Sequence, residues 1–241
     1  MMAETELWLV DLDRTEAALE TLEAATPRLS ADTHQRLDAM ADEAARRERR
    51  LAHIALRILL ERRLGHGMRG TPFVRSATGK PSLPGHGIVF SLAHAGGLAL
   101  IGLAERDPLG VDLERRRPVR VPDARRAPIE AEAVALAAGV PLAGDHPDAR
   151  FLQAWVRIEA AAKALGHGVG AILARLRPGG PEPLVPALHR PQIDVHDVAI
   201  AEDVYAAIAL PAGLEPPPPG AFPDTAAGID DLLGRQSGTR R

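Results

Sequence analysis

The sequence predicts an α+β protein made of two similar halves, because a helical pattern followed by strand-like runs occurs twice along the chain. In the first half, apolar residues recur at helical spacing over residues 51–59, and the pattern ends near Gly65. In the second half, an apolar stripe over residues 151–165 ends at Gly166. Strand-like runs follow each helix, so we expect the two halves to meet near residues 105–110.

The strands of the first half are predicted from short apolar runs and the turn residues between them. Residues 7–10 predict an opening strand. After the turn-rich residues 65–87, two apolar runs at 88–92 and 98–103 flank the turn Ala95-Gly96-Gly97. This arrangement predicts a β-hairpin.

The second half is expected to begin with a strand at Gly110-Val111-Asp112-Leu113-Glu114. Pro128 should open a helix that Gly139 closes. Further strands are predicted at residues 192–195 and 205–210. Beyond residue 211, prolines and polar residues predict a mostly disordered tail, in which residues 229–233 could form one helical turn. The expected organisation is an N-terminal half (1–107), a C-terminal half (108–212) and a tail (213–241).

Composition excludes several classes of function. The chain has 241 residues, 46% of them hydrophobic, and a formal net charge of −3, so a duplex nucleic acid is not the expected partner. It contains no cysteine, which excludes disulfides, zinc–thiolate sites and thiol nucleophiles. Residues 1–10 lack a secretory signal, and no apolar run is long enough to span a bilayer. We therefore expect a cytoplasmic protein without a membrane partner.

Asp112 and Glu114 are separated by one residue on the predicted strand. Side chains alternate along a strand, so both carboxylates should project to one side while Val111 and Leu113 face the core. Two converging oxygen donors on a rigid strand suit Mg²⁺. The alternative is the ordinary exposed face of an amphipathic strand, and the pair alone does not decide between them.

Trp155, Glu159 and Lys163 share one helix face, because they are spaced four residues apart. By themselves they also fit a buried tryptophan beside a surface ion pair. The following Gly166-His167-Gly168 ends the helix and would let the backbone approach a ligand closely.

Four segments with chemically useful residues follow one another along the chain: Gly79-Lys80-Pro81, Phe90-Ser91-Leu92-Ala93-His94, Gly110-Val111-Asp112-Leu113-Glu114, and Trp155-Val156-Arg157-Ile158-Glu159-Ala160 with Lys163, Gly166 and Gly168. In this order they resemble the 4′-phosphopantetheinyl transferase superfamily, in its long, surfactin-synthetase-activating (Sfp) type. The resemblance covers roughly residues 30–210 and is specific as a set, although each segment alone is weak.

The resemblance implies a monomer with two halves related by a pseudo-two-fold axis and coenzyme A in the cleft between them. It assigns Asp112, Glu114 and Glu159 to Mg²⁺. We add the hypothesis that Glu159 also helps to deprotonate the acceptor serine, directly or through a metal-bound water. Lys163 would lie near the transferred phosphate, and Glu130 is a weaker candidate for the proton-accepting role.

Coenzyme A binding is assigned by the same resemblance to five positions: Lys80, Pro81, Ser91, His94 and Arg36. Lys80 and His94 would contact the nucleotide end, and the alignment of Arg36 is loose. The expected reaction transfers phosphopantetheine to a serine of an apo acyl or peptidyl carrier protein. The alternatives are a non-catalytic module that binds coenzyme A or a carrier, and another magnesium-dependent phosphate enzyme such as a nucleotide hydrolase.

This sequence departs from the family pattern at several positions. Ala93 and Ala95 stand where hydroxyl side chains are usual, which removes two potential phosphate donors. Ile158 replaces a common lysine and leaves Arg157 as the nearest cation, and the aromatic expected near Arg126 is absent. Arg115-Arg116-Arg117 directly follow the strand with the carboxylates, where they could offer a basic rim to an acidic carrier.

Overall fold

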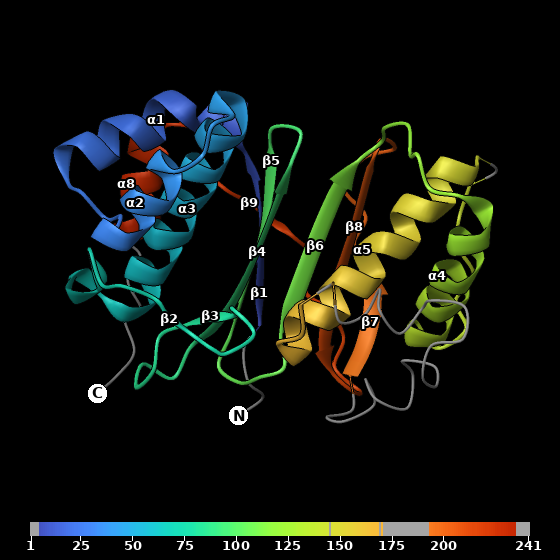
Figure 1. The fold of residues 1–241 in the computed structure, drawn as a ribbon. Helices are drawn as coiled ribbons and strands as arrows, with labels where there is room; N and C mark the ends of the chain where they lie inside the picture. Colours follow the sequence, from blue (N-terminus) through green and yellow to red (C-terminus); the bar gives the residue numbers. More distant parts are fainter. Residues whose placement is uncertain (1–4, 145, 169, 171–192, 235–241) are drawn as a thin grey trace.

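Helices, sheet, sheet and helices form successive layers of the protein (Figure 1). The structure is a computed structural model that describes residues 5–144, 146–168, 170 and 193–234. The predicted α+β class is confirmed. The pseudo-two-fold axis and the division at residue 107 stay predictions.

The first sheet contains the hairpin and the opening strand that the sequence predicts. Its order is β4-β5-β1-β9. The strands are β1 (Glu6–Asp11), β4 (Val89–Ala95), β5 (Leu98–Ala104) and β9 (Gly220–Ala221). Gly96 and Gly97 have φ of 57° and 81°, so they adopt the left-handed conformation that a tight turn between β4 and β5 needs.

Four helices cover the outer face of this sheet: α1 (Leu12–Ala25), α2 (Ala31–Asp38), α3 (Glu43–Leu64) and α8 (Ala226–Gly234). The sequence predicts α3, which ends at Gly65, but not α1. Two of the buried residues of α1 are polar, Thr15 and Glu23, and they interrupt its apolar stripe. Glu23 is satisfied there by the backbone N–H groups of Arg28 and Leu29.

Between α3 and β4, the turn-rich residues form the short helix η1 (His66–Met68) and a small ribbon of β2 (Val74–Arg75) and β3 (Pro81–Ser82). The two strands pair antiparallel. This ribbon carries the predicted Lys80 loop.

The second sheet has the order β6-β8-β7, with β6 (Gly110–Arg115), β7 (Ile193–Asp197) and β8 (Val204–Pro211). Two helices cover its outer face, α4 (Asp123–Leu136) and α5 (Pro147–Leu165). The predicted strands and the end of α5 at Gly166 are confirmed, but Pro128 lies inside α4 instead of opening it. α4 begins one turn earlier, after Pro122. The carbonyl oxygen of Pro122 accepts hydrogen bonds from the backbone N–H groups of Arg125 and Arg126, which form this first turn.

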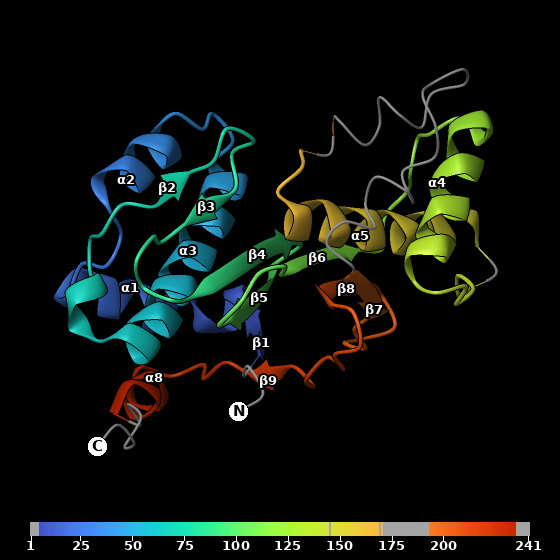
Figure 2. The same cartoon turned by 90° about the horizontal axis from the view of Figure 1, so that it is seen from below.

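The inner faces of the two sheets share one apolar core. Val111 and Leu113 of β6 lie in this core with Leu98 and Leu100 of β5. β4 and β6 run next to each other (Figure 2), and the backbone N–H of Val111 donates to Ser91 Oγ at 2.9 Å. The alternation of β6 therefore turns Gly110, Asp112 and Glu114 away from this core and toward α5.

The segment after residue 212 differs from the expected disordered tail. In Figure 2 it runs along the lower edge of the molecule from β8 past β9, which pairs parallel with β1, to α8 beside α1 and α3. Phe222, Ile229 and Leu232 are buried in the apolar core between the first sheet and its helices, and Arg14 pairs with Asp224 at 2.6 Å. These apolar residues, which follow the prolines, hold the segment against the first half of the protein. Residues 235–241 lie outside the described residues.

Glu132 of α4 is a buried carboxyl, 6% exposed, and Oε1 has no hydrogen-bond partner among the residues that the structure describes. Burial raises the pKa of Glu132 to about 7. The folded state therefore binds the proton more tightly than the unfolded state, so this residue costs stability increasingly as pH rises from 4.5 to about 7. We expect Glu132→Gln to be nearly neutral at pH 4 and to stabilise the protein by about 2 kcal/mol at pH 8. Urea unfolding at both pH values checks this, and a gain independent of pH would contradict it.

Candidate active site

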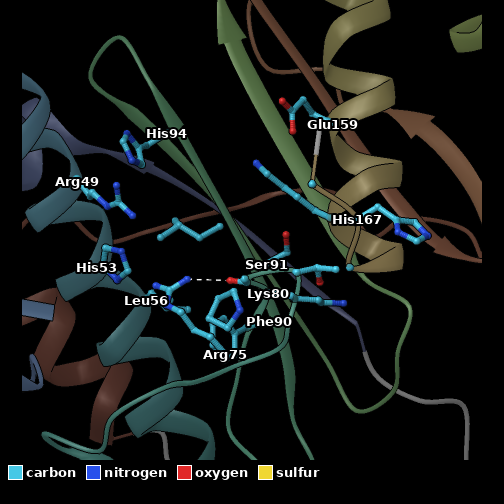
Figure 3. A pocket seen from close by; sticks show the side chains of 17 residues that line it. Arg49, His53, Leu56, Arg75, Lys80, Phe90, Ser91, His94, Glu159 and His167 are labelled. Atoms are coloured by element: carbon cyan, nitrogen blue, oxygen red, sulfur yellow. Dashed lines mark hydrogen bonds between the residues drawn. The ribbon is translucent and has the colours of Figure 1, made fainter. Parts of the chain in front are cut away.

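A pocket of about 410 Å³ lies between α3 and the β2–β3 loop on one side and the C-terminal end of α5 on the other. β4 passes between these walls (Figure 3). Six of the residues predicted from the sequence line it: Lys80, Pro81, Ser91, His94, Glu159 and Lys163. The fold thus brings together residues that are up to 83 positions apart (163 − 80).

The α5 wall depends on a close approach of β6 to the helix backbone. A Cβ atom at Gly110 would lie 2.0 Å from the carbonyl oxygen of Ala160 and 2.4 Å from the nitrogen of Ala164. Only glycine permits this spacing. As a result Lys163 Nζ reaches across to Asp112 Oδ1 at 2.6 Å and to the carbonyl oxygen of Val111 at 3.1 Å.

Of the three carboxylates assigned to Mg²⁺, Glu159 lines the pocket, whereas Asp112 and Glu114 are not among its lining residues and act on Glu159 through their charges. Burial raises the pKa of Asp112, while the ammonium of Lys163 opposes the shift. Burial also raises the pKa of Glu159 to about 7, and the negative charges of Asp112 and Glu114 add to the increase. Glu114 is held by Arg117 at 3.1 Å. Added positive charge between these groups would lower their mutual repulsion.

These carboxylates fit Mg²⁺ in their chemistry, since all three offer hard oxygen donors and repel one another. In the described part of the chain, however, no group of three or more His, Asp or Glu side chains is arranged to hold a metal ion as it stands. Lys163 and Arg117 already bond two of the three carboxylates. Metal binding would therefore require Asp112 and Glu114 to replace their ion pairs with Lys163 and Arg117 by bonds to the metal ion.

His94 of β4 and Lys80 of the β2–β3 loop also line the pocket. His94 Nδ1 lies 3.2 Å from Glu48 Oε1, and burial lowers the pKa of His94 despite this neighbour. Lys80 Nζ donates to Asp107 Oδ1 at 2.8 Å and to the carbonyl oxygen of Ala164 at 3.0 Å. Lys80 thus extends from the β2–β3 loop to the last turn of α5.

Arg49, His53 and Arg75 also line the pocket, and the sequence prediction missed them (Figure 3). Burial first, and then the charge of Arg49, lower the pKa of His53 to about 3. His53 Nδ1 and Arg75 Nε are buried without a hydrogen-bond partner in the residues described. The unpartnered N–H of Arg75 and the neighbouring charge of Arg49 suit a negatively charged ligand. The spacing of Arg49 and His53 on one helix face is the available signal, but four arginines within residues 46–50 are more typical of a solvated helix face.

Arg36 does not line the pocket, although the resemblance assigned it to coenzyme A. It lies on α2, paired with Asp32 at 3.9 Å, and its side chain is 53% exposed. Its charge does reach the site, since it contributes to lowering the pKa of Arg75 after the larger effect of burial.

The departures from the family pattern have structural explanations. Ala93 is 4% exposed and packs in the core between the sheets, so a hydroxyl there would face away from the pocket. Ile158 is buried against the second sheet. Arg157 cannot replace the missing lysine, because its fully buried guanidinium is bound to Asp197 at 2.6 Å on another face of α5.

Comparison with known proteins agrees with the motifs. No family model matches the chain. A curated protein of Synechocystis sp., named "Putative 4′-phosphopantetheinyl transferase slr0495", is 33% identical over 132 residues, which are 52% of this chain and 52% of that protein. The chain thus matches about half the length of this relative. By its ordered motifs and by this similarity, the chain resembles the 4′-phosphopantetheinyl transferase superfamily.

Proposed function

We propose that this protein is a holo-[acyl-carrier-protein] synthase type transferase. It transfers the 4′-phosphopantetheine arm of coenzyme A to a serine hydroxyl of an apo acyl or peptidyl carrier protein, with Mg²⁺, and releases adenosine 3′,5′-bisphosphate. The observation that carries the proposal is a single pocket lined by Arg49, Arg75 and Lys80 on one side and by Glu159 and Lys163 on the other, with Lys163 bonded to Asp112 behind the lining.

The cationic wall would bind the nucleotide end of coenzyme A. Arg49, Arg75 and Lys80 can neutralise its phosphates and His94 can form a hydrogen bond to it, with Pro81 and Ser91 shaping the wall beside them. Lys80 would exchange its bond to exposed Asp107 for a phosphate oxygen, which costs little because that carboxylate becomes hydrated.

Mg²⁺ would be held by Asp112, Glu114 and Glu159, and it would neutralise the charge of the pyrophosphate. The Lys163 ammonium, freed from Asp112, would stabilise the charge that develops on the phosphate groups. Each of these contributions lowers the barrier by positioning and neutralisation, which phosphoryl transfer chiefly requires.

The acceptor serine oxygen forms the new bond to the phosphorus that carries pantetheine, and the bond from that phosphorus to the bridging oxygen breaks. Glu159 would take the serine proton, since it lines the pocket. Glu130 does not line the pocket and is paired with Arg150 at 2.9 Å, so it remains the weaker candidate for this step.

The partners follow from the same proposal: coenzyme A and a carrier protein, with the enzyme acting as a cytoplasmic monomer. Among the helices that the structure describes, none combines the length and apolar composition needed to cross a bilayer.

The proposal is tested by mixing purified protein with an apo carrier, coenzyme A and Mg²⁺ and measuring the intact mass of the carrier. We expect a gain of one phosphopantetheine that disappears in chelator and returns when Mg²⁺ is restored. Coenzyme A binding without any mass gain on fatty-acid, polyketide or peptide carriers would instead indicate the non-catalytic module.

A further inference from the structure

The end of β6, the connection that follows it and the first turn of α4 are together strongly basic. Residues 115–126 contain six arginines and one aspartate, although the whole chain has a net charge of −3. All but one of these arginines are exposed. A concentration of positive charge on a chain of the opposite net sign marks a surface for an acidic partner.

Internal ion pairs occupy half of these arginines. Arg115 faces Asp203 at 3.8 Å, Arg117 binds Glu114 at 3.1 Å, and Arg126 binds Asp148 at 2.8 Å. Arg116, Arg120 and Arg125 have no side-chain ion pair with any residue that the structure describes. These three form what we term the basic rim.

The backbone beneath the basic rim is fixed. At its start, the N–H of Arg116 donates to the carbonyl oxygen of Asp203 at 2.7 Å. Farther on, the guanidinium of Arg126 donates to the carbonyl oxygens of Val119 at 2.7 Å and Val121 at 3.0 Å. A partner would therefore meet charges on an ordered segment, which lowers the entropy lost on binding.

The basic rim is continuous with the candidate active site. β6 carries Asp112 and Glu114, ends at Arg115 and is followed directly by Arg116. Arg117 bonds back to Glu114. A macromolecule bound along this connection would lie beside the strand that carries the proposed metal ligands.

We propose that Arg116, Arg120 and Arg125 form the docking surface for an acidic face of the carrier protein that supplies the serine. The inference rests on the proposed function, which requires a protein acceptor to approach this site. Arg115 and Arg117, which the sequence also suggested, instead hold the segment in place through Asp203 and Glu114.

The test compares the triple variant Arg116→Glu, Arg120→Glu, Arg125→Glu with the matched variant that has lysine at all three positions. For the glutamate variant we expect the KM for apo carrier to rise by at least about tenfold, with a weaker salt dependence. kcat and the affinity for coenzyme A should be retained, which also shows that the variant is folded. The lysine variant should stay close to the original protein, because it keeps the charge.

Direct binding of apo carrier, measured by fluorescence anisotropy without Mg²⁺, separates this inference from the proposed function. Carrier binding that is lost in the glutamate variant supports the basic rim even if the original protein transfers nothing. Transfer with an unchanged carrier KM in the glutamate variant overturns the basic rim while the function stands. Loss of binding only to RNA or to anionic vesicles, with carrier binding intact, also overturns it.

Discussion

Replacing Glu159 with glutamine is expected to lower the rate of carrier modification by at least about 100-fold, the usual scale for removing a positioned base. Glutamine keeps the shape of the side chain but can neither accept the serine proton nor provide a charged metal ligand. Glu159 lines the pocket, and its carboxylate interacts with the charges of Asp112 and Lys163. The rate is measured by intact mass of the carrier at saturating coenzyme A.

Glu130→Gln is the matched control, because Glu130 lies outside the pocket lining and pairs with Arg150. We expect this variant to retain nearly the original rate. A Glu159→Gln protein with normal turnover would remove Glu159 from the proton-transfer step. A large loss in Glu130→Gln alone would transfer that role to Glu130.

The second large effect is expected from Gly110→Ala. The added methyl would collide with backbone atoms of Ala160 and Ala164, at 2.0 and 2.4 Å, and backbone cannot rotate away as a side chain can. β6 and α5 would have to separate, which we expect to destabilise the protein by about 3 kcal/mol or more. The same separation would lengthen the contact between Asp112 and Lys163 and so reduce activity. Urea unfolding and the transfer assay measure the two effects.

Gly67→Ala provides the control for this substitution. A Cβ atom at Gly67 would meet nothing within 4 Å, so we expect a stability change within about 0.5 kcal/mol. Equal stability of the Gly110→Ala and original proteins would show that β6 and α5 are not held as closely as the structure indicates.

Local patterns in the sequence were sufficient to predict the elements on which the site is built. The hairpin of β4 and β5, the strand β6 and the end of α5 each have turn residues or apolar periodicity within a short window. The alternation of β6 also predicted that Val111 and Leu113 face a core, as they do. For these elements, neighbouring residues carry the information.

The features that the sequence did not predict depend on distant partners. Arg49 and Arg75 became pocket residues only when α3 and β2 were placed opposite α5. The sequence did not predict α1, because a charged residue, Glu23, interrupts its apolar stripe. The buried carboxylate is stabilised by hydrogen bonds from backbone N–H groups that follow the helix, and the local pattern does not reveal these partners. The ion pair between Lys80 and Asp107 likewise joins segments whose separation in the chain gives no local pattern.

The position of β9 and α8 has a consequence for how the protein is made. During synthesis, the first sheet and helices α1 to α3 leave the ribosome long before the residues that complete their core. Until then, one edge of β1 lacks its neighbour strand, and the apolar surface that receives Ile229 and Leu232 is open to water. The nascent chain must therefore remain soluble with an incomplete first half until the residues of β9 and α8 have been added, so its exposure to aggregation lasts through the synthesis of the whole second half.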